Sequence, residues 1–184
     1  PVFCALLADR DPDDEGARGV WAVDLDGVGE ARGEVRQAYL RNTPILRTEL
    51  TAADGAAVEI IDFSPRYRQF GRTFRPQAFI RLIRPLAGAP RIRIRLRYAA
   101  GWGGADARRT SGSNHIRYEA GEATLRLTTD CPVSHITEER WFRLEEPIAL
   151  FLGPDEGFEA DLASTTHRML RETTDYWRGW VRTL

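Results

Sequence analysis

Residues 39–48 read YLRNTPILRT and residues 58–65 read VEIIDFSP, and an Asp54-Gly55 turn lies between these two runs. Each run has the composition of a β-strand. An Asp-Gly pair between such runs is a strong hairpin signal, because glycine accepts the positive φ of a tight turn. The stretch therefore predicts two antiparallel strands joined by a short connection.

The same alternation of apolar and polar residues extends from Gly19 to Leu152. Turn signals recur along it, including a weaker one at Gly121-Glu122. The expected strands are 20–25, 35–41, 45–51, 57–63, 78–84, 91–98, 114–119, 123–129, 133–137, 140–144 and 148–152. Because no helical segment separates these short strands, the sequence predicts a mainly β fold, an antiparallel β-sandwich of stacked sheets.

The most regular of these strands is RIRIRLRY at residues 91–98, with four arginines on one face and apolar residues on the other. Four like charges on one strand repel, so we expect neighbouring strands to supply carboxylates or the face to be hydrated. An arginine ladder could hold a phosphate backbone. The face carries no interleaved aromatic residue, so nucleic acid is not favoured as a partner.

The spacing of the apolar residues along the sequence changes near Asp161. Apolar residues then recur at three- and four-residue steps, as in an amphipathic helix: Leu162, Met169, Thr173, Trp177, Trp180, Val181 and Leu184. The predicted organisation is a sandwich domain at 1–158 and a connector helix at 159–184. Trp177 and Trp180 share one face and need a partner surface, either the chain's own sandwich or a further domain. The helix has no C-cap signal, which favours a chain that continues.

The bulk composition fits one ordinary globular domain. The chain has 184 residues, 42% hydrophobic and 29% charged, with a net charge of -1, which gives no general attraction to nucleic acid or anionic lipid. No apolar run approaches the roughly 18 residues that span a bilayer, so no membrane partner is expected. All 26 basic residues are arginine. Their abundance suits bidentate recognition of anions, or follows from codon usage in a GC-rich genome.

The two cysteines, Cys4 and Cys131, make neither a disulfide framework nor a metal set. The two cysteines could form one disulfide with each other or remain as two buried free thiols, and the second alternative is favoured. The chain starts at Pro1 without an initiator Met, so the native N-terminus is expected to be missing. The absence of a signal peptide therefore points only weakly to the cytoplasm.

Catalytic motifs are absent from the sequence: it contains no GxxxxGKS, HExxH, CxxC or GxSxG pattern. His115, His135 and His167 are scattered and are interpreted as structural. A glycosidase needs two facing carboxylates about 5–10 Å apart. Neighbours on a strand point to opposite faces, so Glu138-Glu139 does not meet that geometry. The sequence predicts no catalytic residue, metal ligand or cofactor within these residues.

One long connection, 99–113, contains Gly101-Trp102-Gly103-Gly104. Connections of that length are often functional. Trp102 among glycines suits a stacking platform for a sugar ring, and equally a plug in the domain's own core.

Several segments occur in the order seen in the amino-terminal domain of prokaryotic family-15 glycoside hydrolases, the glucoamylase and trehalase-like group. The chain is similar to that family in the strand 39–48 with its L-x-T ending and in VEIIDFSP at 58–65. Further similar pieces are PVFCALL at 1–7, SNHIRY at 113–118, FLGPDE at 151–156 and TDYWRGW at 174–180. The stretch that follows Arg97 departs from the family, which often has a proline, an aromatic and an acidic residue there.

The resemblance implies a sandwich related to galactose mutarotase, a connector helix and then an (α/α)₆ barrel that carries both catalytic glutamates. No family catalytic residue falls within this chain. On this reading the chain buttresses a missing inverting hydrolase barrel that acts on α-glucosides. Trp177 and Trp180 form the domain junction, and Trp102, Asn114 and His115 are the candidate substrate-binding residues. The expected partners are the barrel and, through it, a carbohydrate.

Two other functions remain open. A free-standing carbohydrate-binding module would use Trp102 as its platform. A mutarotase-like enzyme would need a histidine acid, His115 or His135, beside a glutamate base in one cleft.

Overall fold

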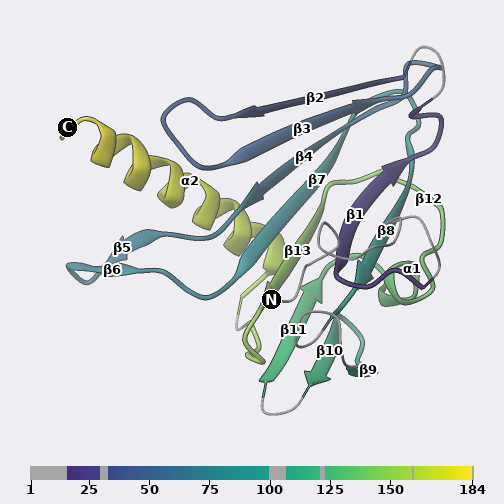
Figure 1. The fold of residues 1–184 in the computed structure, drawn as a ribbon. Helices are drawn as coiled ribbons and strands as arrows, with labels where there is room; N and C mark the ends of the chain where they lie inside the picture. Colours follow the sequence, from purple (N-terminus) through teal and green to yellow (C-terminus); the bar gives the residue numbers. More distant parts are fainter. Residues whose placement is uncertain (1–15, 30–32, 100–106, 121–122, 159, 184) are drawn as a thin grey trace.

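The computed structural model describes residues 16–29, 33–99, 107–120, 123–158 and 160–183. The chain is mainly β, with antiparallel sheets and a C-terminal helix, as predicted (Figure 1). Its elements are β1 Val20–Leu25, β2 Glu34–Tyr39, β3 Leu46–Thr51, β4 Ala57–Phe63, β5 Tyr67–Gln69, β6 Arg72–Phe74, β7 Phe79–Ala87, β8 Arg91–Arg97, β9 Arg108–Ser111, β10 His115–Ala120, β11 Ala123–Thr129, α1 Val133–Thr137, β12 Phe142–Arg143, β13 Ile148–Gly153 and α2 Leu162–Val181.

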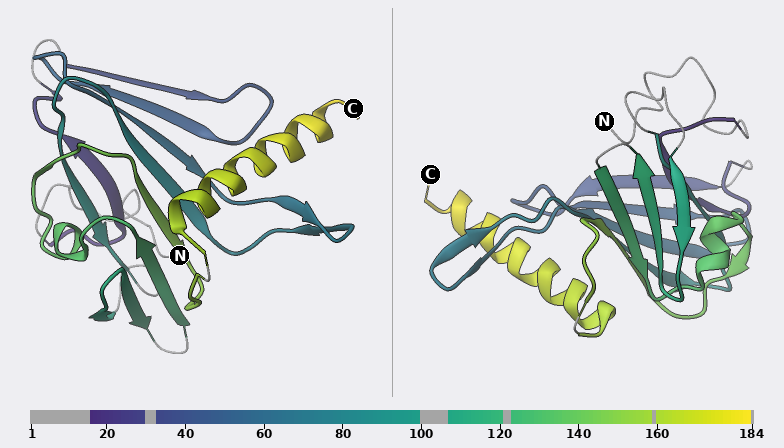
Figure 2. Two further views of the ribbon diagram at one scale, coloured as in Figure 1. Left: turned by 180° about the vertical axis from the view of Figure 1, so that it is seen from behind. Right: turned by 90° about the horizontal axis from the view of Figure 1, so that it is seen from below.

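Two sheets form the sandwich. The larger has the order β2-β3-β4-β7-β13-β11-β10-β9, and the smaller has the order β1-β8-β12. A separate two-stranded hairpin, β5-β6, extends from the body beside α2 (Figures 1 and 2). The turn at Asp54-Gly55 joins β3 to β4 as expected: Gly55 has φ 88°, and Asp54 Oδ1 accepts a hydrogen bond from Ala56 N at 2.9 Å.

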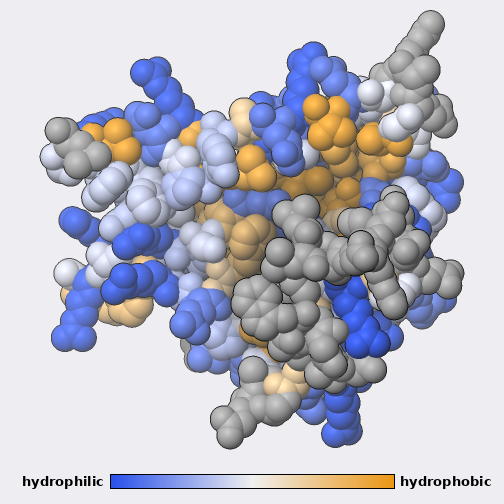
Figure 3. Space-filling model, viewed as in Figure 1, coloured by the Kyte–Doolittle hydropathy of each residue, from blue (hydrophilic) through white to orange (hydrophobic). Residues whose placement is uncertain are grey.

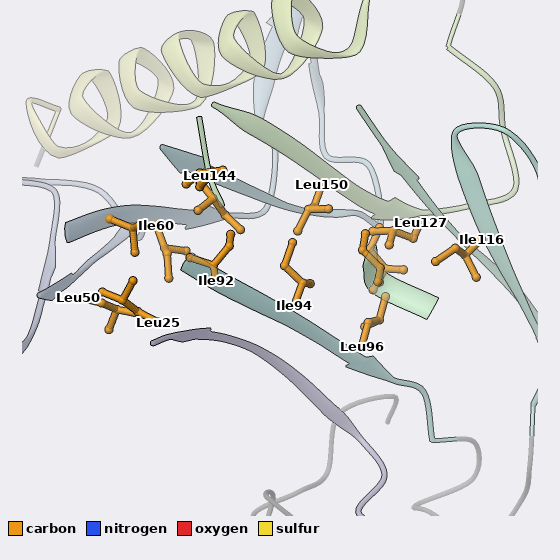
Figure 4. Packing of buried hydrophobic residues seen from close by; sticks show 14 of the residues in the cluster. Leu25, Leu50, Ile60, Ile92, Ile94, Leu96, Ile116, Leu127, Leu144 and Leu150 are labelled. Carbon is orange, nitrogen blue, oxygen red and sulfur yellow. The ribbon is translucent and has the colours of Figure 1, made fainter. Parts of the chain in front are cut away.

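The central strand β4 of the larger sheet is covered on both faces and has no exposed residue. Val58 and Ile60 face the small sheet, in the main core that Figure 4 shows. The labelled members of that core are Leu25, Leu50, Ile60, Ile92, Ile94, Leu96, Ile116, Leu127, Leu144 and Leu150. Ile61 and Phe63 point to the opposite face and pack in a second core with Leu162 and Met169 of α2. The helix therefore covers the outer face of the sandwich.

The arginine ladder of β8 meets the carboxylates that its charge predicts. Asp24 on the neighbouring strand β1 accepts from Arg93 and Arg95, each at 2.8 Å. Arg97 forms a two-bond ion pair with Glu139, both contacts 2.6 Å. The ladder is thus part of the fold of the small sheet.

One predicted strand is wrong. Residues 133–137 form the short helix α1, although Val, Ile and Thr favour strands. Pro132 caps this helix with φ −52°, a value suited to a helix start, and only Ile136 is buried in the core. A half-buried strand would bury every second residue of this segment, whereas the helix buries only one residue of its single turn.

The other predicted strands are found at their expected places. The strands 20–25, 57–63 and 123–129 have the predicted ends, the remaining strands have shifted ends, and 140–144 is reduced to Phe142–Arg143. The sequence reading missed β5, β6 and β9. The expected turn at Gly121-Glu122 lies outside the described residues, and so do Cys4 and Trp102. Cys131 is a buried free thiol, as favoured.

Candidate functional site

The helix α2 carries one apolar stripe whose two halves have different surroundings. Asp161 begins the helix, since its carboxylate accepts a hydrogen bond from Ser164 N at 2.8 Å. The stripe is first buried against the sheet, through Leu162, Thr165, Thr166, Met169 and Thr173. It continues at the same spacing through Tyr176, Trp177, Trp180 and Val181. This second half of the stripe is only partly covered by the rest of the chain: Trp177 is half-buried and Trp180 is 49% exposed.

The rings on this second half form a chain of edge contacts. Trp177 meets Trp180 at 5.8 Å and Tyr176 at 5.5 Å between ring centroids, both nearly perpendicular. The guanidinium carbon of Arg66 lies 5.0 Å from the ring centroids of both Tyr176 and Trp177. Arg66 N also donates a hydrogen bond to Thr173 Oγ1 at 3.0 Å. These contacts fix the start of the β5-β6 hairpin to the helix.

A groove of about 460 Å³ separates the end of α2 from the β2–β3 connection. Its walls are Tyr39, Asn42, Thr43, Pro44, Trp177, Trp180 and Val181. Tyr39 is 68% exposed there. Thr43 holds the connection in shape, because its hydroxyl donates to Leu40 O at 2.9 Å while its backbone N donates to the same oxygen at 3.0 Å.

A second cavity of about 400 Å³ shares Tyr39, Pro44 and Trp177 with this groove. It is also lined by Asp62, whose two carboxylate oxygens accept from Arg81 at 2.7 and 2.9 Å. Because both oxygens accept hydrogen bonds from one guanidinium, Asp62 and Arg81 form a two-bond ion pair in the wall of this cavity. Two further arginines, Arg66 and Arg75, line the cavity as well.

A third groove, of about 440 Å³, lies on the side of α2 that faces the β5-β6 hairpin. It is lined by Arg68, by the helix residues Glu172, Asp175, Tyr176, Gly179 and Trp180, and by Thr183 just beyond the helix. The last turns of α2 are thus bordered by hollows toward both hairpins. We call these surroundings the α2-end surface, which comprises Tyr39, Pro44, Arg66, Arg68, Arg75, Tyr176, Trp177, Trp180 and Val181. Two buried donors on it, Arg66 Nε and Trp177 Nε1, have no hydrogen-bond partner within the described part of the chain.

The predicted site residues do not converge on one place. Trp177 and Trp180 come together at the α2-end surface, whereas Asn114 and His115 lie at the start of β10 and line none of the hollows around Trp177. His115 Nδ1 is 3.2 Å from Asn114 Oδ1. The third expected substrate residue, Trp102, lies outside the described residues.

The environment of His115 disfavours the charged form of its imidazole. Burial, together with the positive charges of Arg126 and Arg117, lowers the pKa of His115 below its ordinary value. Its ring packs closely over Gly112, where an added Cβ would come within 2.4 Å of the imidazole Cε1. A side chain at position 112 would therefore displace the imidazole from its present place.

His135, the second histidine considered as an acid, makes packing contacts within its own domain. It lies on α1 with its ring stacked on Phe142 at 4.4 Å, and its Nδ1 is 3.8 Å from Cys131 Sγ. Burial raises the pKa of the Cys131 thiol to about 12. Neither His115 nor His135 has a glutamate hydrogen-bond partner among the described residues. In the same part of the chain, no group of three or more His, Cys, Asp or Glu residues is arranged to hold a metal ion.

The sequence reading missed Tyr39, Arg66 and the whole β5-β6 hairpin as parts of this surface. One signal was available: residues 64–77 contain four arginines, three aromatic residues and no acid. No local sequence pattern predicts that Tyr39 lies near Trp177, because the two residues are far apart in the sequence.

Comparison with protein-family models, with curated proteins and with solved structures gives no match for this chain. Among the described residues, no helix is both long and apolar enough to cross a membrane.

Proposed function

We propose that this chain is the non-catalytic N-terminal sandwich domain of an inverting glycoside hydrolase that acts on α-glucosides, of the glucoamylase or trehalase type. Its α2-end surface would receive the catalytic barrel. The observation that carries the proposal is the apolar stripe of α2, which continues beyond its own sheet and leaves Trp180 49% exposed beside Trp177. The order of family-like segments along the sequence supports the same reading.

The chemistry of the surface suits a permanent interface. A tryptophan buries about 150–250 Å² when it is covered, so Trp177 and Trp180 could anchor a large contact. A second protein surface would cover the exposed parts of these rings.

Three carboxylates that are held by arginines suit a structural role. Asp62 is held by Arg81, and Glu139 by Arg97, whose hydrogen bond lowers the pKa of Glu139. Burial would raise the pKa of Glu59, but hydrogen bonds from Arg84 and Arg47 outweigh it and lower that pKa. A lowered pKa does not suit Glu59 or Glu139 to the role of a general acid, which must carry a proton near neutral pH. The free thiol of Cys131 suits the cytoplasm, which we retain as the proposed location.

The first test is the coding sequence beyond Leu184. The proposal expects a helical domain with two well-separated glutamates, and hydrolysis of trehalose or short α-glucans by the complete polypeptide but not by residues 1–184. A reading frame that stops near Leu184 would refute it.

The second test concerns the junction. In the complete enzyme, Trp177→Ala with Trp180→Ala should lower the melting temperature, because the cavities left at the interface cost several kcal/mol. Trp141→Ala is a matched control, since Trp141 is also partly exposed (37%) but lies next to β12, away from α2. Unchanged melting of the double variant would exclude the anchoring role.

A carbohydrate-binding module is the second candidate, favoured by one observation: the exposed ring of Tyr39 faces the same hollows as Trp177. Paired aromatic rings beside polar groups can stack on sugar rings. Titration of tryptophan fluorescence in residues 1–184 with maltooligosaccharides and trehalose separates the two. A saturable change that Tyr39→Ala abolishes supports the module, and a flat titration supports the docking surface.

A further inference from the structure

The β5-β6 hairpin has features that the stability of the fold does not require. Its two-residue connection is Phe70-Gly71, with φ 50° and 72°. Hairpin turns of this kind favour Asn-Gly, and a bulky residue at positive φ is strained. Phe70 is also 89% exposed, more than any other large apolar residue in the described chain. An aromatic residue that is both strained and solvated points to a role outside the domain.

The hairpin also concentrates unbalanced positive charge. Residues 64–77, which we call the hairpin arm, contain four arginines and no acid. Arg68, Arg72 and Arg75 are exposed, and none of them has a carboxylate partner among the described residues. Figure 3 shows this hairpin as blue hydrophilic atoms around paler apolar ones. An anionic partner is therefore the complement of the arm.

The base of the arm is fixed and its tip is free. Tyr67 is buried and stacks on Phe74, with the ring centroids 5.7 Å apart and the planes 10° from parallel. The register places Arg72 opposite Gln69, so Arg68 and Arg72 point to opposite faces of the hairpin. A partner that reaches both faces has to surround the arm, as a protein groove does. A nucleic acid backbone laid along one face would leave half of the charge unused.

We infer that the hairpin arm inserts into an acidic groove of the catalytic barrel, with Phe70 in an apolar pocket at its end. This inference rests on the proposed function, which places that barrel after α2. The arm lies beside the last turns of α2, where the following domain would emerge (Figure 1). A second copy of this chain is a poorer partner, because the buried Glu59 and the half-buried Glu139 already bind arginines of their own chain.

Photo-cross-linking in the complete polypeptide tests the contact. p-Benzoylphenylalanine replaces Phe70 in one variant and, as a control, Leu86 in another, since Leu86 is 41% exposed at the opposite end of β7. Irradiation of the first should give a cross-link within one polypeptide, mapped by mass spectrometry to an Asp- and Glu-rich segment beyond residue 184. A cross-link to a second copy or to nucleic acid, or a yield no higher than at Leu86, would overturn the inference.

Charge reversal tests the chemistry. Arg68→Glu with Arg72→Glu, placed in the Phe70 cross-linking variant, should reduce the cross-link yield about ten-fold, because like charges then face the groove. Arg108→Glu with Arg143→Glu is the matched control, as both side chains are exposed at 78% and 63% and lie away from the arm. An equal yield in the arm variant and the control would refute the acidic groove.

The two proposals fail differently. A coding sequence without a barrel removes the proposed function and this inference together. A barrel that is present and active, but to which position 70 does not cross-link, removes this inference alone.

Discussion

The arginines of β8 and those of the hairpin arm have opposite surroundings. On β8, Arg93 and Arg95 share Asp24, and Arg97 holds Glu139 through two hydrogen bonds. In the arm, Arg68 and Arg72 are exposed and have no carboxylate partner in the described chain. Since every basic residue of this protein is arginine, residue type cannot separate the two regions. The environment does: one set holds the sandwich together and the other is available to a partner.

The aromatic and aliphatic residues follow the same division. Ile92 and Ile94 of the sandwich body are fully buried. Phe70, Tyr39 and Trp180, at the other end, are exposed by 89%, 68% and 49%. A domain that supports another one is expected to bury its apolar residues in the body and to leave apolar residues exposed at the end that contacts the partner. Substitutions in these two parts of the molecule should therefore have unequal effects on its stability.

The largest effect is expected in the body. Ile94→Ala removes a side chain that is fully buried between the sheets, and should lower the free energy of unfolding by about 4 kcal/mol. Urea denaturation of residues 1–184 measures it. Trp180→Ala in the same chain should change that free energy by less than about 1 kcal/mol, since the ring is half exposed. Comparable losses for the two would remove the distinction between body and end.

The next effect concerns the buried pair Asp62–Arg81, whose side chains are 11% and 12% exposed. Asp62→Ala leaves the guanidinium of Arg81 without its carboxylate and should cost about 3 kcal/mol. The double variant Asp62→Ala with Arg81→Met should recover part of the loss, because the uncompensated charge is then gone. If the single variant unfolds with wild-type stability, the pair is not a structural anchor and Asp62 becomes a candidate ligand in its cavity.

A smaller effect depends on pH. The hydrogen bond from Arg97 lowers the pKa of Glu139 in the folded protein, so the unfolded chain takes up a proton on this residue at higher pH than the folded chain. The stabilisation is therefore present above the unfolded pKa and is lost as the pH falls through the folded one. Glu139→Gln should cost about 1.5 kcal/mol at pH 7 and less in acid. Melting curves from pH 7 down to pH 3 test this, and a loss that is independent of pH would contradict it.

The smallest effect has the opposite sign. Phe70→Asn places a residue that accepts positive φ before Gly71 and should stabilise residues 1–184 by about 0.5–1 kcal/mol. Thermal unfolding measures it, with Gln69→Asn as a control for composition. A destabilised Phe70→Asn variant would mean that Phe70 serves the fold of the domain itself.

Much of the fold was predictable because its signals are local. Alternation placed most strands of both sheets, Asp54-Gly55 placed the β3–β4 hairpin, and the change of period placed α2. Prediction failed at Val133–Thr137, where β-favouring residues form a helix after Pro132. It failed again at β5 and β6, whose three-residue strands are too short for a periodic pattern to appear.

The candidate site was predictable only in part. The spacing of Trp177 and Trp180 put both rings on one helix face, and their incomplete cover agrees with the need for a partner surface. No local pattern could join Tyr39 or Arg66 to them. The expected substrate residues Asn114 and His115 lie apart from this surface, and Trp102 is outside the described residues.

Side-chain period and turn chemistry act over a few residues, so most strands, the helix α2 and their apolar faces could be predicted from the amino-acid sequence alone. Which of those faces are covered became evident only in the packed fold. The larger sheet ends before α2 does, so the first half of the helix stripe is buried and the second half lies open beside two hairpins. Cover depends on which distant segments meet, and that follows from the packing of the whole chain.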